Sequence, residues 1–175
     1  MQKLINNINR YKILIVLFLI TVSSACTIKY STTGASISPD VKTVSVQFFP
    51  NRAPLGMPNL GQYFTDELKD KFLSQTSLSL IENNGHLNFE GEITGYSTKP
   101  IAITGNEVAA QNRLTIKVHV VFINEKDPDQ NFDSSFSRYK DYNSTENLSS
   151  VEEGLVEDIV EELMEDIFNK SVVNW

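Results

Sequence analysis

The chain has 175 residues, the length of one ordinary domain, and 41% of them are apolar, which is enough to bury a core of that size. Its formal net charge is −7, and removal of the first 25 residues, which hold three basic side chains and no acid, would lower it to −10. A protein this acidic lacks the basic face that binding to a phosphate backbone requires, so the composition argues against nucleic acid as a partner.

The N-terminus predicts export and lipid attachment. Residues 1–12 carry the three basic side chains, and about ten apolar residues follow, which is typical of a secretory signal peptide and shorter than the roughly 20 residues of a transmembrane helix. Ser23, Ser24 and Ala25 then precede Cys26, the only cysteine. This order resembles the bacterial lipobox, which implies cleavage before Cys26 and acylation of that residue. An ordinary signal peptide before an unmodified cysteine, or an uncleaved anchor, is the alternative.

These features divide the chain into three parts. We expect residues 1–25 to be a lipoprotein signal peptide and residues 26–40, rich in Ser, Thr and Gly, to be a lipidated flexible tether. Residues 41–175 should then form a single folded domain.

The spacing of apolar residues predicts the elements of that domain. In chain order they are a strand over 42–49, a helix over 60–73 capped by Asn59, a short strand over 77–82, strands over 87–97, 112–124 and 131–142, and a long helix within residues 147–168. Strand 112–124 has the strictest alternation. In strand 87–97 the same alternation places Gly91 and Gly95 on the packed side, where they would leave room for a helix.

The last helix has an acidic surface and an apolar stripe. A capping box, Ser149 with Glu152 or Ser150 with Glu153, predicts its start. Two helices and several strands that share one apolar face predict an α+β fold, with one mostly antiparallel or mixed sheet of four to five strands and both helices packed on one face.

The residues available for chemistry are few. Cys26 is expected to be acylated, His86 falls in a turn and His119 lies on the polar face of a strand, without the spacing of a zinc site or a catalytic triad. Carboxylate pairs such as Glu161 and Glu162 lie on the wet face of a helix. We therefore predict that the protein is not an enzyme and binds no metal or cofactor.

Basic residues on two neighbouring strands are a candidate contact surface. Arg113, Lys117 and His119 alternate along one strand, and Arg138 and Lys140 lie on the next. If the strands pair, these cations suit a phosphorylated amphiphile or an anionic partner. Ordinary solvated strand charge is the alternative, and strand phase places Arg138 and Lys140 on the more apolar side of their strand.

Several segments, taken in order, resemble a known family. They are VSVQFFPNRAP in the first strand, FEGEITGY, NRLTIKV, FSRYKDY and the acidic C-terminal helix, all after a lipobox and a short tether. This order resembles the LptE lipoproteins, in the form found in Bacteroidetes-type bacteria, over about residues 26–170.

The resemblance implies a fold and a function. LptE proteins place two helices on one face of a mainly four-stranded sheet, are lipid-anchored in the outer membrane facing the periplasm, and sit as a plug inside the β-barrel LptD. They support barrel assembly and the passage of lipopolysaccharide to the cell surface, and some bind lipopolysaccharide through basic residues. The acidic C-terminal helix would repel lipopolysaccharide phosphates, so a lipid contact is expected on the sheet.

A membrane-anchored carrier of a lipid or peptide, with no barrel partner, is the competing hypothesis. Such a carrier needs an apolar cavity between helices and sheet. Large side chains are expected to fill that space: Phe64, Phe72, Phe89, Ile159 and Leu163.

Overall fold

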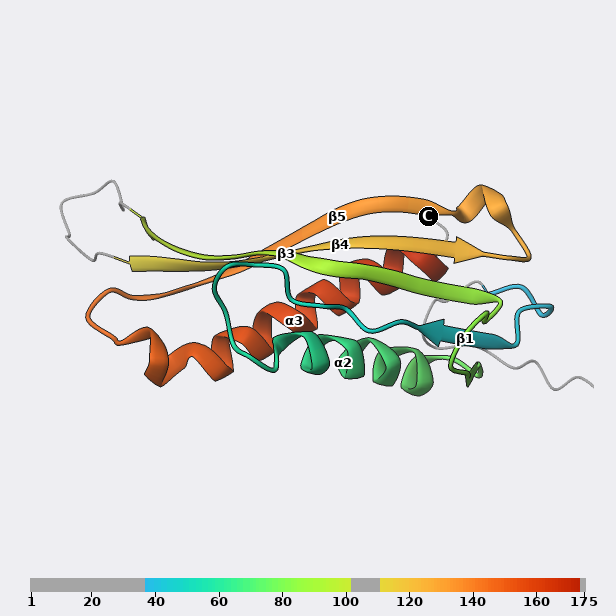
Figure 1. Ribbon diagram of the computed structural model, residues 1–175, viewed down its shortest axis with the longest axis horizontal. Coiled ribbons are helices and arrows are strands. Elements are labelled where there is room, and N and C mark those ends of the chain that lie inside the picture. Colours follow the sequence, from blue (N-terminus) through green and yellow to red (C-terminus); the bar gives the residue numbers. More distant parts are fainter. Residues whose placement is uncertain (1–36, 102–110, 174–175) are drawn as a thin grey trace, which may run out of the picture. The chain divides into compact units, whose positions relative to one another are not determined.

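The fold is a five-stranded mixed sheet with two helices on one face (Figure 1). It is seen in a computed structural model that describes residues 37–101 and 111–173; the predicted signal peptide, Cys26 and most of the predicted tether lie outside the described residues. The elements are β1 (Thr43–Val46), α2 (Leu60–Gln75), β2 (Ser79–Leu80), β3 (Leu87–Ile101), β4 (Gln111–Asn124), the short 3-10 helix η1 (Pro128–Gln130), β5 (Phe132–Asn143) and α3 (Leu148–Val172).

The strand order across the sheet is β2-β1-β3-β4-β5. β1 runs parallel to β2 and to β3, whereas β3, β4 and β5 are antiparallel neighbours along the chain. Helices α2 and α3 lie side by side beneath the sheet (Figure 1). This confirms the predicted α+β fold, with its mixed sheet of four to five strands and its two helices on one face.

The side chains of β4 show why one face of the sheet is buried. Its side chains alternate strictly, and the five that point toward the helices have no solvent exposure: Leu114, Ile116, Val118, Val120 and Phe122. Burying such a side chain stabilises the fold by about 1.5–3 kcal/mol relative to leaving it exposed. The alternation therefore fixes which face of the sheet the helices cover.

A chain of aromatic rings connects the two layers. Phe72 of α2 lies 4.8 Å from Phe89 of β3 and 5.2 Å from Phe168 of α3, measured between ring centroids. Phe89 in turn lies 4.8 Å from Phe122 of β4. The rings are tilted relative to one another, an arrangement that adds about 0.5–1.5 kcal/mol per pair beyond the area they bury.

Strand β3 contains a bulge that the sequence pattern did not predict. The register with β4 shifts between Ile93 and Gly95. Before the bulge the odd-numbered residues of β3 face the helices. After it Tyr96 is buried, and Gly95 is opposite Lys117 on the face of the sheet that points away from the helices, here called the open face. The prediction that Gly95 lies on the packed side is therefore wrong, because a bulge inserts one residue and exchanges the two faces.

Gly91 does lie on the packed side, but its neighbours are not a helix. A Cβ atom at Gly91 would lie 2.0 Å from the carbonyl oxygen of His119 and 2.7 Å from the ring of Phe49. The glycine thus admits a tilted β4 backbone and the Phe49 ring. Helix α2 makes its own close approach at Gly61, where a Cβ would lie 2.5 Å from the Phe49 carbonyl oxygen.

The helix starts differ in part from the predicted caps. Asn59 does precede α2, but its side chain makes no capping hydrogen bond. Helix α3 begins earlier than a capping box at Ser149 or Ser150 requires, and Asn147 caps it by accepting a hydrogen bond from the backbone N–H of Ser149 at 3.3 Å. The predicted capping box is wrong because Asn147, a strong N-cap residue, stands just before the first helical turn.

Two glycine substitutions test these assignments. We expect Gly91→Ala to destabilise the protein by about 2–3 kcal/mol, because the new methyl group overlaps the β4 backbone. Gly154→Ala is the matched control: a Cβ there meets nothing within 4 Å, and alanine in a helix should add up to about 1 kcal/mol of stability. Urea unfolding measures both, and equal effects would contradict the close approach at Gly91.

Candidate functional site

The five basic residues expected to form one surface are divided by the sheet. Strands β4 and β5 do pair, as the candidate surface required. Arg138 is opposite Ile116 and Lys140 is opposite Leu114, so both face the helices. The other three, Arg113, Lys117 and His119, lie on the open face.

Arg138 and Lys140 are held by carboxylates of α3. Arg138 donates two hydrogen bonds to Asp166, at 2.6 and 2.5 Å, and Lys140 lies 2.9 Å from Glu162 and 3.7 Å from Asp158. These hydrogen bonds are the main reason that the pKa values of both cations are raised. Both cations are therefore engaged in attaching β5 to α3.

The row of ion pairs between β5 and α3 forms because side chains recur at similar spacings along the two elements. Side chains on one face of a strand recur about every 6.8 Å, and side chains four apart on a helix recur about every 6 Å. Lys170 continues the series, since its ammonium donates to the Ser134 hydroxyl at 2.6 Å and lies 4.8 Å from the Phe132 ring. Inward charges and a covering helix are also two ways of protecting an edge strand from unwanted pairing.

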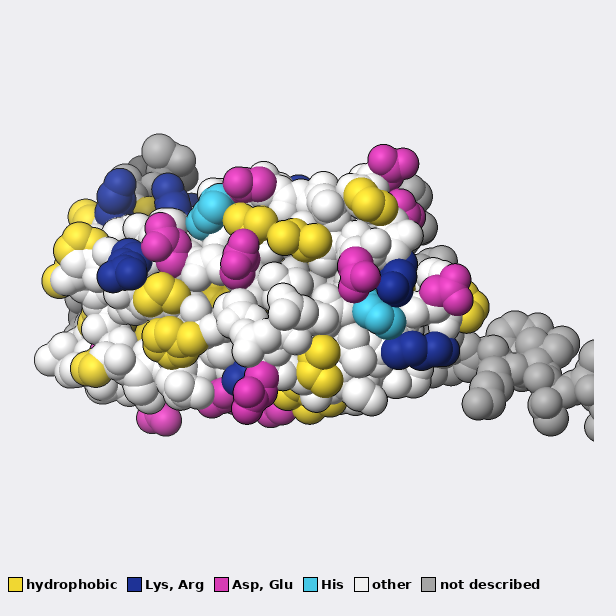
Figure 2. Space-filling model, turned by 45° about the vertical axis from the view of Figure 1, so that its right-hand side comes forward, with side chains coloured by type: hydrophobic (Ala, Val, Ile, Leu, Met, Phe, Trp, Pro, Cys, Tyr) yellow, Lys and Arg dark blue, Asp and Glu magenta, His cyan; other side chains and the backbone are white. Residues whose placement is uncertain are grey.

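On the open face, two of the three basic residues already have acidic partners. Arg113 donates to both carboxylate oxygens of Asp141, at 2.7 and 2.9 Å, and its guanidinium lies 3.6 Å from the Tyr139 ring centroid. Their shared hydrogen bonds are the main reason that the pKa of Arg113 is raised and that of Asp141 lowered. His119 Nε2 lies 2.5 Å from Asp133. On the face drawn in Figure 2, acidic and basic side chains are interspersed.

Lys99 is a basic residue that the sequence analysis missed. The bulge in β3 places it on the open face, directly opposite Arg113, and its side chain is exposed. Simple alternation from Phe89 would have turned Lys99 toward the helices. A glycine inside a strand pattern is itself a signal of a bulge, and Gly95 is where the sequence offered that signal.

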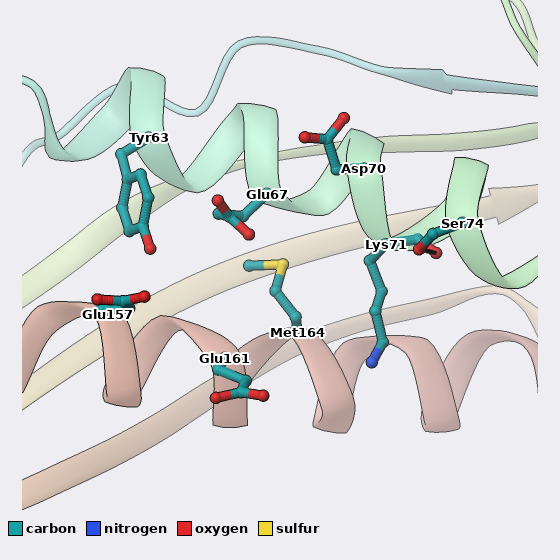
Figure 3. Close-up of a pocket in the computed structure, with 8 residues that line it drawn as sticks. All are labelled: Tyr63, Glu67, Asp70, Lys71, Ser74, Glu157, Glu161 and Met164. Atoms are coloured by element: carbon teal, nitrogen blue, oxygen red, sulfur yellow. Dashed lines mark hydrogen bonds between the residues drawn. The ribbon is translucent and has the colours of Figure 1, made fainter.

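A cleft of about 380 Å³ lies between the two helices (Figure 3). Tyr63, Glu67 and Lys71 of α2 point toward α3, and Lys71 forms an ion pair with Glu165. The remaining charges that line the cleft are acidic: Glu67, Asp70, Glu157 and Glu161. Within the described residues no group of acidic, His or Cys side chains is arranged to hold a metal ion.

The acidic side chains that line the cleft lie close enough to repel one another. Partial burial, and then the neighbouring Asp70 and Glu157, raise the pKa of Glu67. Burial and Glu67 likewise raise the pKa of Tyr63. The carboxylates that line this cleft would repel an anionic ligand.

A protein-family model matches nearly all of the folded domain. The family model described as "LptE: Lipopolysaccharide-assembly" matches residues 41–171, about three quarters of the chain. The chain belongs to the LptE family. LptE proteins are non-enzymatic, outer-membrane-associated lipoproteins that act in lipopolysaccharide assembly, and the match confirms the resemblance seen in the sequence. No helix in the described part of this LptE protein is long and apolar enough to cross a membrane.

Several solved structures are similar to this chain at low sequence identity. A putative neuraminyllactose-binding hemagglutinin homolog from Helicobacter pylori has a TM-score of 0.50 and 10% identity, over 81% of this chain and 89% of that one. Lipoprotein B from Nitrosomonas europaea (TM-score 0.47, 12% identity, 82% and 88% covered) and a minor lipoprotein from Acinetobacter baumannii (0.45, 12%, 74% and 91%) are also similar. No curated protein matches the chain.

Neutralising Glu67 tests the electrostatics of the cleft. Because its pKa is raised in the folded state, ionisation of Glu67 destabilises the fold, and that cost appears as pH rises through the unfolded and then the folded pKa. Glu67→Gln should therefore stabilise the protein at pH 7 by about 0.2–0.5 kcal/mol, as for other like-charge neighbours on helices, and should have no such effect at pH 3.

Denaturant titrations at both pH values measure this difference. Asp129→Asn, on the exposed η1, is the control for removal of one negative charge elsewhere. A Glu67→Gln variant that is destabilised at pH 7 would contradict the repulsion in the cleft.

Proposed function

We propose that this LptE protein assists assembly of the LptD β-barrel and plugs it during transport of lipopolysaccharide to the cell surface. The observation that carries the proposal is the family match over residues 41–171, which spans every described strand and nearly all of α3. The open face supports it, because a polar sheet face with paired charges suits the polar interior of a barrel.

The interior of the domain disfavours the carrier hypothesis. A carrier needs free apolar volume between its helices and its sheet, and the side chains expected to fill that space have no solvent exposure: Phe64, Phe72, Phe89, Ile159 and Leu163. The cleft described above opens to solvent between the helices and is lined mainly by charged groups. It does not suit an acyl chain.

Lipid attachment at Cys26 is part of the proposal. The signal peptide pattern and the small residues before Cys26 support acylation, and two or more acyl chains make a stable anchor. The tether over residues 26–40 would then join the anchor to β1 and keep the folded domain at the periplasmic side of the outer membrane.

Direct contact with lipopolysaccharide is assigned to the open face. Arg138 and Lys140 are paired with carboxylates of α3, and His119 Nε2 lies against Asp133, so these three side chains are already engaged. Lys117 is exposed, and Arg113 still has the Nη1 group that Asp141 does not bind. Arg113 and Lys117 are therefore the residues we propose for the contact.

Crosslinking in intact outer membranes tests the barrel partnership. The full-length protein should take up a labelled fatty acid, remain in the membrane fraction and give a barrel-sized adduct that contains LptD. Cys26→Ala should lose the label and most of the adduct, because the domain is no longer held at the membrane.

Two results would count against these proposals. Label retained by Cys26→Ala would contradict the lipidation site. Absence of a barrel-sized adduct from the labelled wild-type protein would leave the carrier hypothesis ahead.

Charge reversal on the open face tests the lipopolysaccharide contact. Arg113→Glu with Lys117→Glu should weaken binding of purified protein to lipopolysaccharide by at least about tenfold, because two attractive charges become repulsive. Lys42→Glu with Lys126→Glu, at the other end of the sheet, is the matched control. Surface plasmon resonance on protein checked for folding by circular dichroism measures both, and unchanged binding would remove the contact while leaving the family assignment intact.

A further inference from the structure

The two edges of the sheet are protected from further pairing to different degrees. Strand β5 carries charged side chains on both faces, with Asp133 and Asp141 on the open face and Arg138 on the helix side, and α3 lies beneath it (Figure 1). At the opposite edge, β2 consists of Ser79 and Leu80, and neither is charged. Charge is one means by which natural proteins keep a strand edge from pairing. Strand β2 therefore lacks a protection that β5 has.

The backbone polar groups of Leu80 point away from the sheet. Before it, the Ser79 N–H donates to the Lys42 carbonyl oxygen at 2.9 Å. After it, the Ile81 N–H donates to the Val44 carbonyl oxygen, also at 2.9 Å. Because alternate residues of a parallel strand bond to the same neighbour, the N–H and C=O groups of Leu80 point to the other side. No strand in the described part of the chain lies there, so Leu80 offers one donor and one acceptor to an additional strand.

Apolar side chains are exposed on both faces at this edge. Leu80 is paired with the buried Val44 and therefore lies on the helix side, where it is 37% exposed. Ile81 is the next residue, so its side chain points to the open face, and it is also 37% exposed. The side chains of an additional strand alternate in the same way, so one such strand covers both.

The occupant that fits this edge is an extended segment of another protein. An acyl chain has no donor or acceptor to pair with the backbone of Leu80. A second copy is disfavoured, because the formal net charge of −7 makes two copies repel, and two-residue strands bury far less than the roughly 1,200 Å² of a stable interface. Residues 77–81 hold no charge, so the segment that matches them is uncharged.

We infer that β2 is a docking edge for an extended, uncharged segment of a partner protein, which adds to the sheet beyond β2 and places apolar side chains beside Leu80 and Ile81. The backbone of the segment bonds to the N–H and C=O groups of Leu80. The inference goes beyond the proposed function, because the wall of a closed barrel has no free strand edge to offer.

A seven-residue peptide of alternating valine and threonine, with capped ends, tests the inference. When it binds the full-length protein in detergent, hydrogen exchange should slow in the segment that contains Leu80, because that amide becomes bonded. The same peptide methylated on its three central backbone nitrogens should bind at least about fivefold more weakly, since the Leu80 carbonyl oxygen loses its donor. Fluorescence anisotropy of the labelled peptides measures both affinities.

Two proline variants separate docking from folding. Leu80→Pro deletes an N–H that makes no hydrogen bond within the described residues. Compared with Leu80→Ala, it should lower peptide affinity at least about fivefold further and leave the urea midpoint nearly unchanged. Ser79→Pro deletes the N–H that bonds Lys42, so it should instead lower the urea midpoint.

Four results would overturn the inference: no binding of the unmethylated peptide, equal binding of the methylated one, equal affinity in Leu80→Pro and Leu80→Ala, or protection at β5 instead of β2. A concentration-dependent dimer in which residues 79–81 are protected without peptide would also overturn it, in favour of a second copy. Because these measurements use no barrel, none of these results touches the proposed partnership with LptD.

Discussion

The alternation of buried and exposed side chains along β4 is the constraint on which the rest of the molecule depends. Because every second residue is fully buried against the helices, β4 fixes one dry and one wet face for the sheet. The antiparallel register with β4 then determines which side chains of β3 and β5 lie on each face. This is why Arg138 and Lys140, one strand away from Arg113, face α3 instead of joining it.

The bulge in β3 modifies this constraint at one point, and its effects are wide. Without it, Tyr96 would leave the core, where its hydroxyl donates a hydrogen bond to Glu152 in the first turns of α3. Burial and this hydrogen bond raise the pKa of Tyr96. The same inserted residue turns Gly95 and Lys99 to the open face. The bulge thus allows a hydrogen bond between β3 and α3 and brings Lys99 to the same face of the sheet as Arg113.

The sequence predicted most of the fold because its signals are local and periodic. The 3.6-residue and two-residue periods located both helices and the long strands to within a few residues, and Asn84 does adopt the positive φ of 56° expected for its turn. The candidate site was less predictable, since strand phase alone could not reveal the shift at Gly95 or the carboxylates of α3 that bind Arg138. Ion pairs between distant elements depend on tertiary register, which one sequence does not encode in any local pattern.

The acidic helices do not set the charge of the open face, because α2 and α3 lie on the opposite side of the sheet. Helix α3 lies beneath the sheet, on the side away from the open face (Figure 1). The Debye length at physiological ionic strength is about 8 Å, so exposed charges farther apart than that are largely screened. Several carboxylates of α3 are also paired with Arg138, Lys140 and Lys71. The field near Lys99 and Lys117 is therefore set by the charged groups of the open face itself, where Asp141 pairs with Arg113.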